Sequence, residues 1–202
     1  MTPESASALV LSAGSSERRG EFKPLMTLGG TTILERAIRL FQSAGIRRIY
    51  VVVGHRAAEL TPIVERLGAR AVVNARYSEG MYSSVKAGVS HLKESTESFF
   101  TLPVDIPLVR TATVLELLNA CPAGGYAICY PTFGGRRGHP PLIGSRHLPA
   151  ILDYGGDGGL AALLKKLEPL SVNVPVSDEF IHADMDRPED YLRLAEHLAS
   201  HE

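Results

Sequence analysis

The sequence predicts an α/β fold: a single-domain, Rossmann-like, mainly parallel sheet with helices on both faces. Two observations lead to this prediction. Short apolar runs alternate along the chain with segments whose apolar residues recur at helical spacing. The 202 residues also match the size of one domain, and they contain no internal repeat or low-complexity linker. We therefore expect one domain over residues 1–202.

The first strand and the first helix have clear boundary signals. Residues 8–11 form a short apolar run before Gly14, which is the pattern of a buried parallel strand. Thr32 and Glu35 form a capping-box pattern at the start of a helix, and Gly45 marks its end.

The same alternation continues to the end of the chain, although the pattern loosens after Cys121. We expect Pro62 to open a second segment within a helix at 57–67. Thr113 and Glu116 are expected to cap a helix at 114–118. The other predicted strands lie at 49–53, 71–73, 99–102, 126–130 and 172–174. The other predicted helices lie at 81–92 and 188–198, and one more follows the glycine-rich stretch at 154–159 and runs through residue 164.

Composition argues against several classes of protein. The formal net charge is −1, which gives no sign of the positive surface that nucleic-acid binding uses. No apolar run approaches the length of a transmembrane helix, and the first residues lack the basic region of a signal peptide. We interpret Cys121 and Cys129 as reduced, partly buried thiols. A cytoplasmic protein without a membrane or nucleic-acid partner is expected.

A loop rich in glycine, serine and basic residues follows the first strand. Parallel sheets bind ligands beyond the carboxyl ends of their strands, so this loop lies where a ligand is expected. Gly14 would allow a ligand to approach the backbone closely. The backbone N–H groups and the hydroxyls of Ser15 and Ser16 could donate hydrogen bonds to phosphate oxygens. Arg18 and Lys23 would supply positive charge for a triphosphate. The alternative is a polar surface loop, which the position after the first strand disfavours.

Two acidic motifs contain candidate metal ligands. Asp105 lies just past the strand at 99–102, where a carboxylate suits Mg²⁺ that also contacts substrate phosphates. The alternative is an aspartate in a proline-flanked turn. Asp184 and Asp186 precede the last predicted helix, and either of them could complete the metal site; Asp186 is the first choice. The alternative role for this acidic segment is capping of the helix.

Two further segments contain candidate binding residues. Asn74 follows a strand, so its amide could read a base or ribose edge, and Ser83 and Ser84 begin a helix whose N–H groups attract anions. Capping explains Ser83 almost as well. Arg137 and His139 lie in a Gly/Arg-rich loop that suits a second phosphorylated substrate, although His139 could simply bond to the backbone.

These motifs resemble those of the MobA-like nucleotidyltransferases. The loop at 11–24 is similar to the family signature LxAGxSxRMGxxK, with Arg19 in place of methionine. Later motifs follow in the family's order over nearly the whole chain, although Arg187 replaces a threonine and the arginine of the Gly-Asp-x-Gly-Ala-Arg motif is missing. The signature is most similar to the molybdenum cofactor cytidylyltransferase branch, because Ala13 stands where the guanylyltransferase branch has glycine.

The resemblance implies the nucleotide-diphospho-sugar transferase type of fold and an Mg²⁺-dependent nucleotidyltransferase. By resemblance the nucleotide is CTP and the phosphorylated acceptor is molybdopterin or its molybdenum form, with a molybdoenzyme or its maturation factor as a candidate protein partner. The implied residues are Arg18, Lys23 and Asp105 for catalysis; Leu11, Ala13, Gly14, Ser15, Ser16, Lys23, Asn74, Ser83 and Ser84 for the nucleotide; Asp105, Asp186 and Asp184 for the metal; and Arg137 and His139 for the acceptor.

Two alternatives stay open at this point. Families that act on a sugar phosphate or a polyol phosphate share the first loop and the aspartate, so the fold alone does not exclude them. A non-catalytic chaperone for the molybdenum cofactor belongs to a different class, and the presence of Arg18, Lys23 and Asp105 argues against it because a carrier does not need a metal site.

Overall fold

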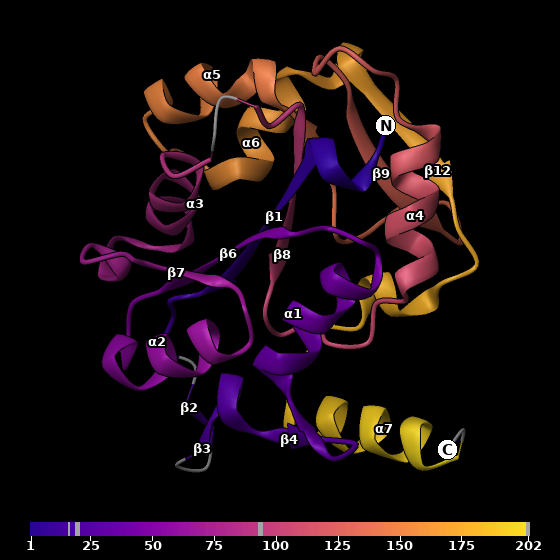
Figure 1. Ribbon diagram of the computed structural model, residues 1–202. Coiled ribbons are helices and arrows are strands. Elements are labelled where there is room, and N and C mark those ends of the chain that lie inside the picture. Colours follow the sequence, from indigo (N-terminus) through magenta and orange to yellow (C-terminus); the bar gives the residue numbers. More distant parts are fainter. Residues whose placement is uncertain (16, 19–20, 93–94, 201–202) are drawn as a thin grey trace.

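The computed structural model describes residues 1–15, 17–18, 21–92 and 95–200. Within this part of the chain the main sheet has the strand order β10-β9-β11-β8-β1-β6-β7, and β12 pairs with β9 (Figure 1). Its strands are β1 Ala6–Ser12, β6 Arg48–Val53, β7 Arg70–Val73, β8 Ser98–Pro103, β9 Ile128–Phe133, β10 Arg136–Arg137, β11 Leu142–Gly144 and β12 Ser171–Pro175. The predicted fold class is confirmed.

The centre of the sheet is parallel, as the sequence predicted. Leu9 of β1 pairs with Tyr50 of β6 on one side and with Thr101 of β8 on the other. The β11 strand was missed, and it runs antiparallel to both β8 and β9. It is only three residues long and ends at Gly144, where a Cβ atom would lie 2.1 Å from the Gly125 carbonyl oxygen. So short a segment has no periodicity for a sequence pattern to reveal.

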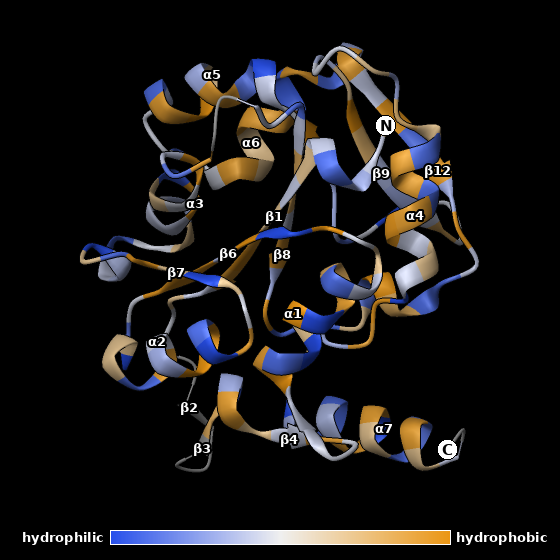
Figure 2. Cartoon of the chain, viewed as in Figure 1, coloured by the Kyte–Doolittle hydropathy of each residue, from blue (hydrophilic) through white to orange (hydrophobic). Residues whose placement is uncertain are grey.

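Helices cover both faces of the sheet (Figure 1). On one face, buried residues of α1, α2, α4 and α7 join a single apolar cluster, and on the other face those of α3, α5 and α6 pack against Leu9 and Leu11. Figure 2 shows hydrophobic residues along the central strands β6 and β8. The helices are α1 Ile33–Ser43, α2 Ala57–Arg66, α3 Met81–Val89, α4 Thr111–Ala120, α5 Leu148–Asp153, α6 Gly159–Lys166 and α7 Pro188–Ala199.

Short strands and 3₁₀ turns connect these elements. None of the helices in the described part of the chain is long and apolar enough to cross a membrane. The short strands are β2 Glu17–Arg18, β3 Glu21–Phe22, β4 Thr27–Leu28 and β5 Thr31–Thr32, and the 3₁₀ turns are η1 Pro3–Ser5, η2 Lys23–Leu25, η3 Tyr77–Glu79, η4 Ser145–His147, η5 Glu168–Leu170 and η6 Glu179–His182.

Two of the predicted helix signals are confirmed, the cap at Thr32 and the stop at Gly45, which follows the C-cap Ala44 with φ +82°, and two are wrong. The Thr32 hydroxyl accepts a hydrogen bond from the Glu35 N–H at 3.2 Å, so this cap forms as expected. Pro62 lies inside a continuous α2 rather than at the start of a second segment. Thr113 is in the first turn of α4, after the N-cap Arg110, and its hydroxyl donates to Asp178 at 2.7 Å. This distant carboxylate takes the capping role that the local pattern assigned to Thr113 and Glu116.

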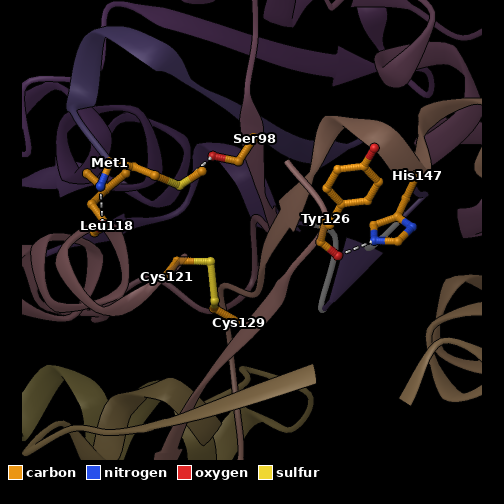
Figure 3. The surroundings of a disulfide bond; sticks show 7 residues. All are labelled: Met1, Ser98, Leu118, Cys121, Tyr126, Cys129 and His147. Atoms are coloured by element: carbon orange, nitrogen blue, oxygen red, sulfur yellow. Dashed lines mark hydrogen bonds between the residues drawn. A yellow bond between two sulfur atoms is a disulfide. The ribbon is translucent and has the colours of Figure 1, made fainter. Parts of the chain in front are cut away.

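The interpretation of the cysteines as reduced thiols is also wrong for this structure. Cys121 and Cys129 form a disulfide, with Cα atoms 5.9 Å apart (Figure 3). Cys121 ends α4 and Cys129 lies on β9. Because α4 packs against β9, the fold brings together two side chains that are eight positions apart in the chain.

Candidate active site

The order in which the chain adds strands to the sheet reverses at β1. The chain passes from β1 to β6 and β7 on one side, and then returns to place β8 on the other side. Ligand sites of parallel sheets lie outside the carboxyl ends of the strands at such a point. Here the Val104 N–H, just after β8, donates to the Leu11 carbonyl of β1 at 3.0 Å, so the two following loops start side by side.

Three residues from separate sequence motifs meet at this edge of the sheet. Lys23 begins η2 and is only 3% exposed. Its Nζ lies 3.4 Å from Asp105 Oδ2 and 3.5 Å from Asp186 Oδ1. A cation and two carboxylates are therefore close together where the fold places a ligand, and this arrangement suits a metal-bound phosphate chain.

A backbone contact holds the two aspartate loops together. The Met185 N–H donates to the Asp105 carbonyl at 3.0 Å, and the Met185 side chain is buried in the core. Burial raises the pKa of Asp184, and the negative charges of Asp186 and Asp105 raise it further. A cation bound here would relieve this repulsion between like charges.

The carboxylates of this site fit a metal that shares its ligands with substrate. No group of three or more His, Cys, Asp and Glu side chains in the described ranges is arranged to hold a metal ion by itself. Mg²⁺ usually takes one or two carboxylates and completes its shell with waters and substrate phosphates. The pair Asp105 and Asp186 matches that donor set, and Asp184 is its neighbour in sequence.

A pocket of about 730 Å³ opens beside this site, between α3, α6, β8 and the β9–β10 hairpin. Most of its surface is apolar. Two residues that line it, Thr101 and His139, each have a buried polar atom, Oγ1 and Nδ1, without a hydrogen-bond partner among the described residues. Burial lowers the pKa of His139, although a hydrogen bond to the Thr101 carbonyl and the charges of Asp105 and Asp184 oppose this effect. In a neutral His139, one of the two ring nitrogens carries no proton and can accept a hydrogen bond.

Arg137 lies on the wall of the same pocket, but its guanidinium is already engaged. It donates two hydrogen bonds to Glu168, at 2.8 and 2.7 Å, and one to Asn173 at 2.6 Å. Its Cζ also lies 4.2 Å from the centre of the Tyr130 ring. The hydrogen bond to Arg137 lowers the pKa of Glu168, so both partners are charged at neutral pH. An acceptor phosphate would have to compete with this carboxylate for Arg137.

Asn74, Ser83 and Ser84 form a buried hydrogen-bond network at the start of α3. Asn74 Nδ2 donates to the Ser83 hydroxyl at 2.8 Å and to the Ser84 hydroxyl at 3.0 Å. Asn74 Oδ1 accepts from the Arg76 N–H at 3.0 Å. Both N–H bonds of the amide are thus used within the protein, and the network fixes the turn between β7 and α3. Its role in nucleotide binding stays a prediction.

The structure describes only part of the first loop. Leu11 and Ala13 are buried, whereas Gly14 and Ser15 are exposed. The Ala13 carbonyl accepts from the His55 N–H at 3.0 Å, which joins the loop to the end of β6. Ser16 lies outside the described residues, and of Arg18 only the backbone, paired in β2, is described.

Sequence reasoning missed two polar residues of this region. Thr101 interrupts the apolar run at 99–102 within β8, and a buried hydroxyl there could have marked the wall of a ligand pocket. Asp178 gave no such signal. Its buried carboxylate accepts from the Arg110 N–H at 2.8 Å and from the Phe180 N–H at 3.1 Å, in addition to Thr113. It thereby holds the segment before Asp184 against the start of α4.

Comparison with known proteins finds similarity over nearly the whole chain. Residues 8–170 match the family model described as the MobA-like NTP transferase domain. A nicotine blue oxidoreductase of Paenarthrobacter nicotinovorans is 30% identical over 193 residues, which cover 92% of this chain and 94% of the relative. A probable molybdenum cofactor guanylyltransferase of Opitutus terrae is 27% identical, with the same shares covered. A solved nucleotidyl transferase from Methanothermobacter thermautotroptrophicus superposes with a TM-score of 0.85 at 25% identity, covering 98% of this chain and 99% of that one.

Proposed function

We propose a specific reaction for this chain, which belongs to the MobA-like NTP transferase family and is a nucleotidyltransferase. The reaction is Mg²⁺-dependent transfer of the cytidylyl group of CTP to a phosphorylated acceptor, molybdopterin or its molybdenum form. The observation that carries the proposal is the convergence of Lys23, Asp105 and Asp186 beside the loop that follows β1.

The chemistry is a displacement at phosphorus. An oxygen of the acceptor phosphate attacks the α-phosphorus of CTP, a new P–O bond forms, and the bond to the β-phosphate oxygen breaks as pyrophosphate leaves. The acceptor phosphate is already ionised near neutral pH, so no general base is needed. The protein contributes positioning and charge, and these terms dominate phosphoryl-type transfers.

Each part of the site has a role in this reaction. The backbone after Gly14, with Ser15 and Ser16, cradles the triphosphate, and Lys23 and Arg18 balance its charge. Asp105 and Asp186 would hold the Mg²⁺, with Asp184 beside them. When bound there, the metal ion would offset the negative charge of the two anionic substrates.

The mostly apolar pocket beside the site supports an acceptor with a flat ring system, whose faces would pack on its walls. Its apolar walls would cover a ring system, and the polar residues Thr101 and His139 also line the pocket. Arg137 would reach an acceptor phosphate by exchanging its bonds to Glu168. A sugar phosphate or polyol phosphate would leave much of this apolar surface in contact with water, so the pocket favours the pterin over that alternative.

The deciding assay measures pyrophosphate release for each NTP with each class of acceptor. We expect release with CTP and molybdopterin, and Asp105→Asn should reduce it at least a hundredfold because the amide keeps the shape and loses the charge. The matched control is Asp153→Asn, which alters an exposed carboxylate on α5. Full Mg²⁺-dependent activity in Asp105→Asn would reduce Asp105 to a turn residue and overturn the assignment.

A second candidate function comes from one relative. A protein that is 30% identical over nearly its full length is a nicotine blue oxidoreductase, and the apolar pocket here would also take a flat dye. Such a reaction would consume a reductant and no NTP. The buried Lys23 with its two carboxylates suits a triphosphate and a metal better than it suits hydride transfer. Dye reduction without pyrophosphate release in any NTP panel would reverse this preference.

A further inference from the structure

Lys23 is a buried cation between the two carboxylates to which we assign the metal. Its side chain is 3% exposed, whereas those of Asp105 and Asp186 are 26% and 64% exposed. Solvent therefore reaches the carboxylates but hardly reaches the ammonium group. Pro24, the next residue, lies with Lys23 in η2, which fixes the backbone that carries the side chain.

A buried ammonium group needs anionic partners, because its desolvation is costly without them. Lys23 has these partners in the two carboxylate oxygens at 3.4 and 3.5 Å. A second cation on the same carboxylates would be repelled by the ammonium group at short range. Lys23 and a divalent metal ion therefore compete for one pair of anions.

We propose that Lys23 is the internal counter-ion of the Asp105–Asp186 pair and makes metal binding depend on bound nucleotide. Without nucleotide, the ammonium group neutralises the carboxylates and opposes a metal ion. With nucleotide, the triphosphate gives Lys23 another anionic partner and supplies the further oxygen ligands that Mg²⁺ requires. Lys23 is then a positioning residue for the metal as well as a contact to the triphosphate. The inference rests on the metal role proposed above for Asp105 and Asp186.

The test measures Mn²⁺ binding to the full chain without nucleotide, by electron paramagnetic resonance of the free ion. Lys23→Met should bind Mn²⁺ at least tenfold more tightly than the wild type, because the competing charge is gone. Adding Asp105→Asn to that variant should abolish the gain. Unchanged or weaker binding by folded Lys23→Met would overturn the inference.

Matched variants separate this effect from a general change of charge or fold. Lys166→Met removes one positive charge on α6, where the lysine lies 4.7 Å from the Tyr154 ring, and it should leave Mn²⁺ binding unchanged. Lys23→Arg keeps the cation and should stay as weak as the wild type. Circular dichroism and thermal melting check folding, and Lys23→Gln replaces Lys23→Met if that variant is unfolded.

The same titrations distinguish failure of this inference from failure of the proposed function. In the presence of CTP, Asp105→Asn should bind Mn²⁺ far more weakly than the wild type. If it does so while Lys23→Met and Lys23→Gln show no gain without nucleotide, the metal site stands and only the counter-ion role is wrong. If Asp105→Asn binds Mn²⁺ as the wild type does, the metal assignment itself fails.

Discussion

Ala13 is the residue that separates the two expected nucleotide preferences. Its side chain is 4% exposed and belongs to the apolar cluster of Leu9 and Leu11, while its carbonyl is bonded to His55. The methyl group therefore packs against the sheet at the base of the loop. This packing is consistent with a purely structural role for Ala13. At the same position, the methyl group would also narrow the space that a purine base needs.

We predict that Ala13→Gly relaxes a preference for CTP over GTP. A single methyl group typically discriminates by about 1–3 kcal/mol, so the wild-type ratio of kcat/KM should be roughly tenfold or more in favour of CTP. Competition assays with equal CTP and GTP measure this ratio in both proteins. Preferential guanylyl transfer by the wild type would contradict the choice of nucleotide, and an unchanged ratio in Ala13→Gly would leave Ala13 as a packing residue.

Asp178 links the start of α4 to the segment that leads to Asp184. Its carboxylate accepts hydrogen bonds from the N–H of Arg110, the N-cap of α4, from the Thr113 hydroxyl in the first turn of α4, and from the Phe180 N–H. The segment after it leads to Ile181, whose carbonyl accepts from the His139 N–H at 2.9 Å, and then to Met185. One buried carboxylate therefore anchors the connection between the Asp105, His139 and Asp186 loops.

We predict that Asp178→Ala lowers the free energy of unfolding by about 2–4 kcal/mol, because it leaves buried N–H and O–H donors without their acceptor. Urea denaturation measures the loss. The exposed Asp153→Ala is the control, and its change should stay within about 0.5 kcal/mol. A loss for Asp178→Ala no larger than that of the control would show that water replaces the carboxylate without penalty.

The contact of α3 with β1 depends on Gly88. A Cβ atom at this position would lie 2.1 Å from Leu9 Cδ1 and 2.8 Å from Leu9 Cδ2. Leu9 is fully buried at the centre of the sheet, so it has little space to move aside.

We predict that Gly88→Ala destabilises the fold by about 1–3 kcal/mol, because overpacking outweighs the better helix propensity of alanine. Gly155→Ala is the matched control, since nothing lies within 4 Å of its added Cβ. Thermal or urea unfolding of the two variants gives the comparison. A Gly88→Ala variant that is as stable as the control would mean that the helix shifts freely on the sheet.

At the scale of the whole molecule, substrate binding should be visible as stability. The candidate site joins loops that follow β1 and β8 to the segment before α7, so a ligand bound there holds together parts distant in sequence. Anything that binds only the folded state stabilises it by mass action.

We predict that Mg²⁺ with CTP, at a hundredfold excess over its Kd, raises the free energy of unfolding by about 2.7 kcal/mol. The shift in Tm should be larger for CTP than for GTP at equal concentration, and it should shrink when EDTA removes the metal. Asp105→Asn is the control that should lose the metal-dependent part. A Tm that is the same with and without either nucleotide would contradict the assignment of the nucleotide site to these loops.

The sequence by itself determined the α/β class, the parallel centre of the sheet and the position of the loop after β1, because these depend on local periodicity and on turn residues. Apolar runs identify buried strands, and Thr32 with Glu35 marks a helix start within four residues. The motifs around Lys23, Asp105 and Asp186 were also visible as separate segments of the chain.

Only the tertiary structure decided which of these segments meet. Lys23 lies between Asp105 and Asp186, and Arg137 forms an ion pair with Glu168. Asp178 accepts hydrogen bonds at the start of α4, and Cys121 forms a disulfide with Cys129. In most of these contacts the partners are dozens of residues apart in the chain, and even the close pair of cysteines depends on how α4 packs on β9. Such pairings are set by strand order and helix packing, which act between distant residues, and no local pattern of apolar, polar or turn residues encodes them.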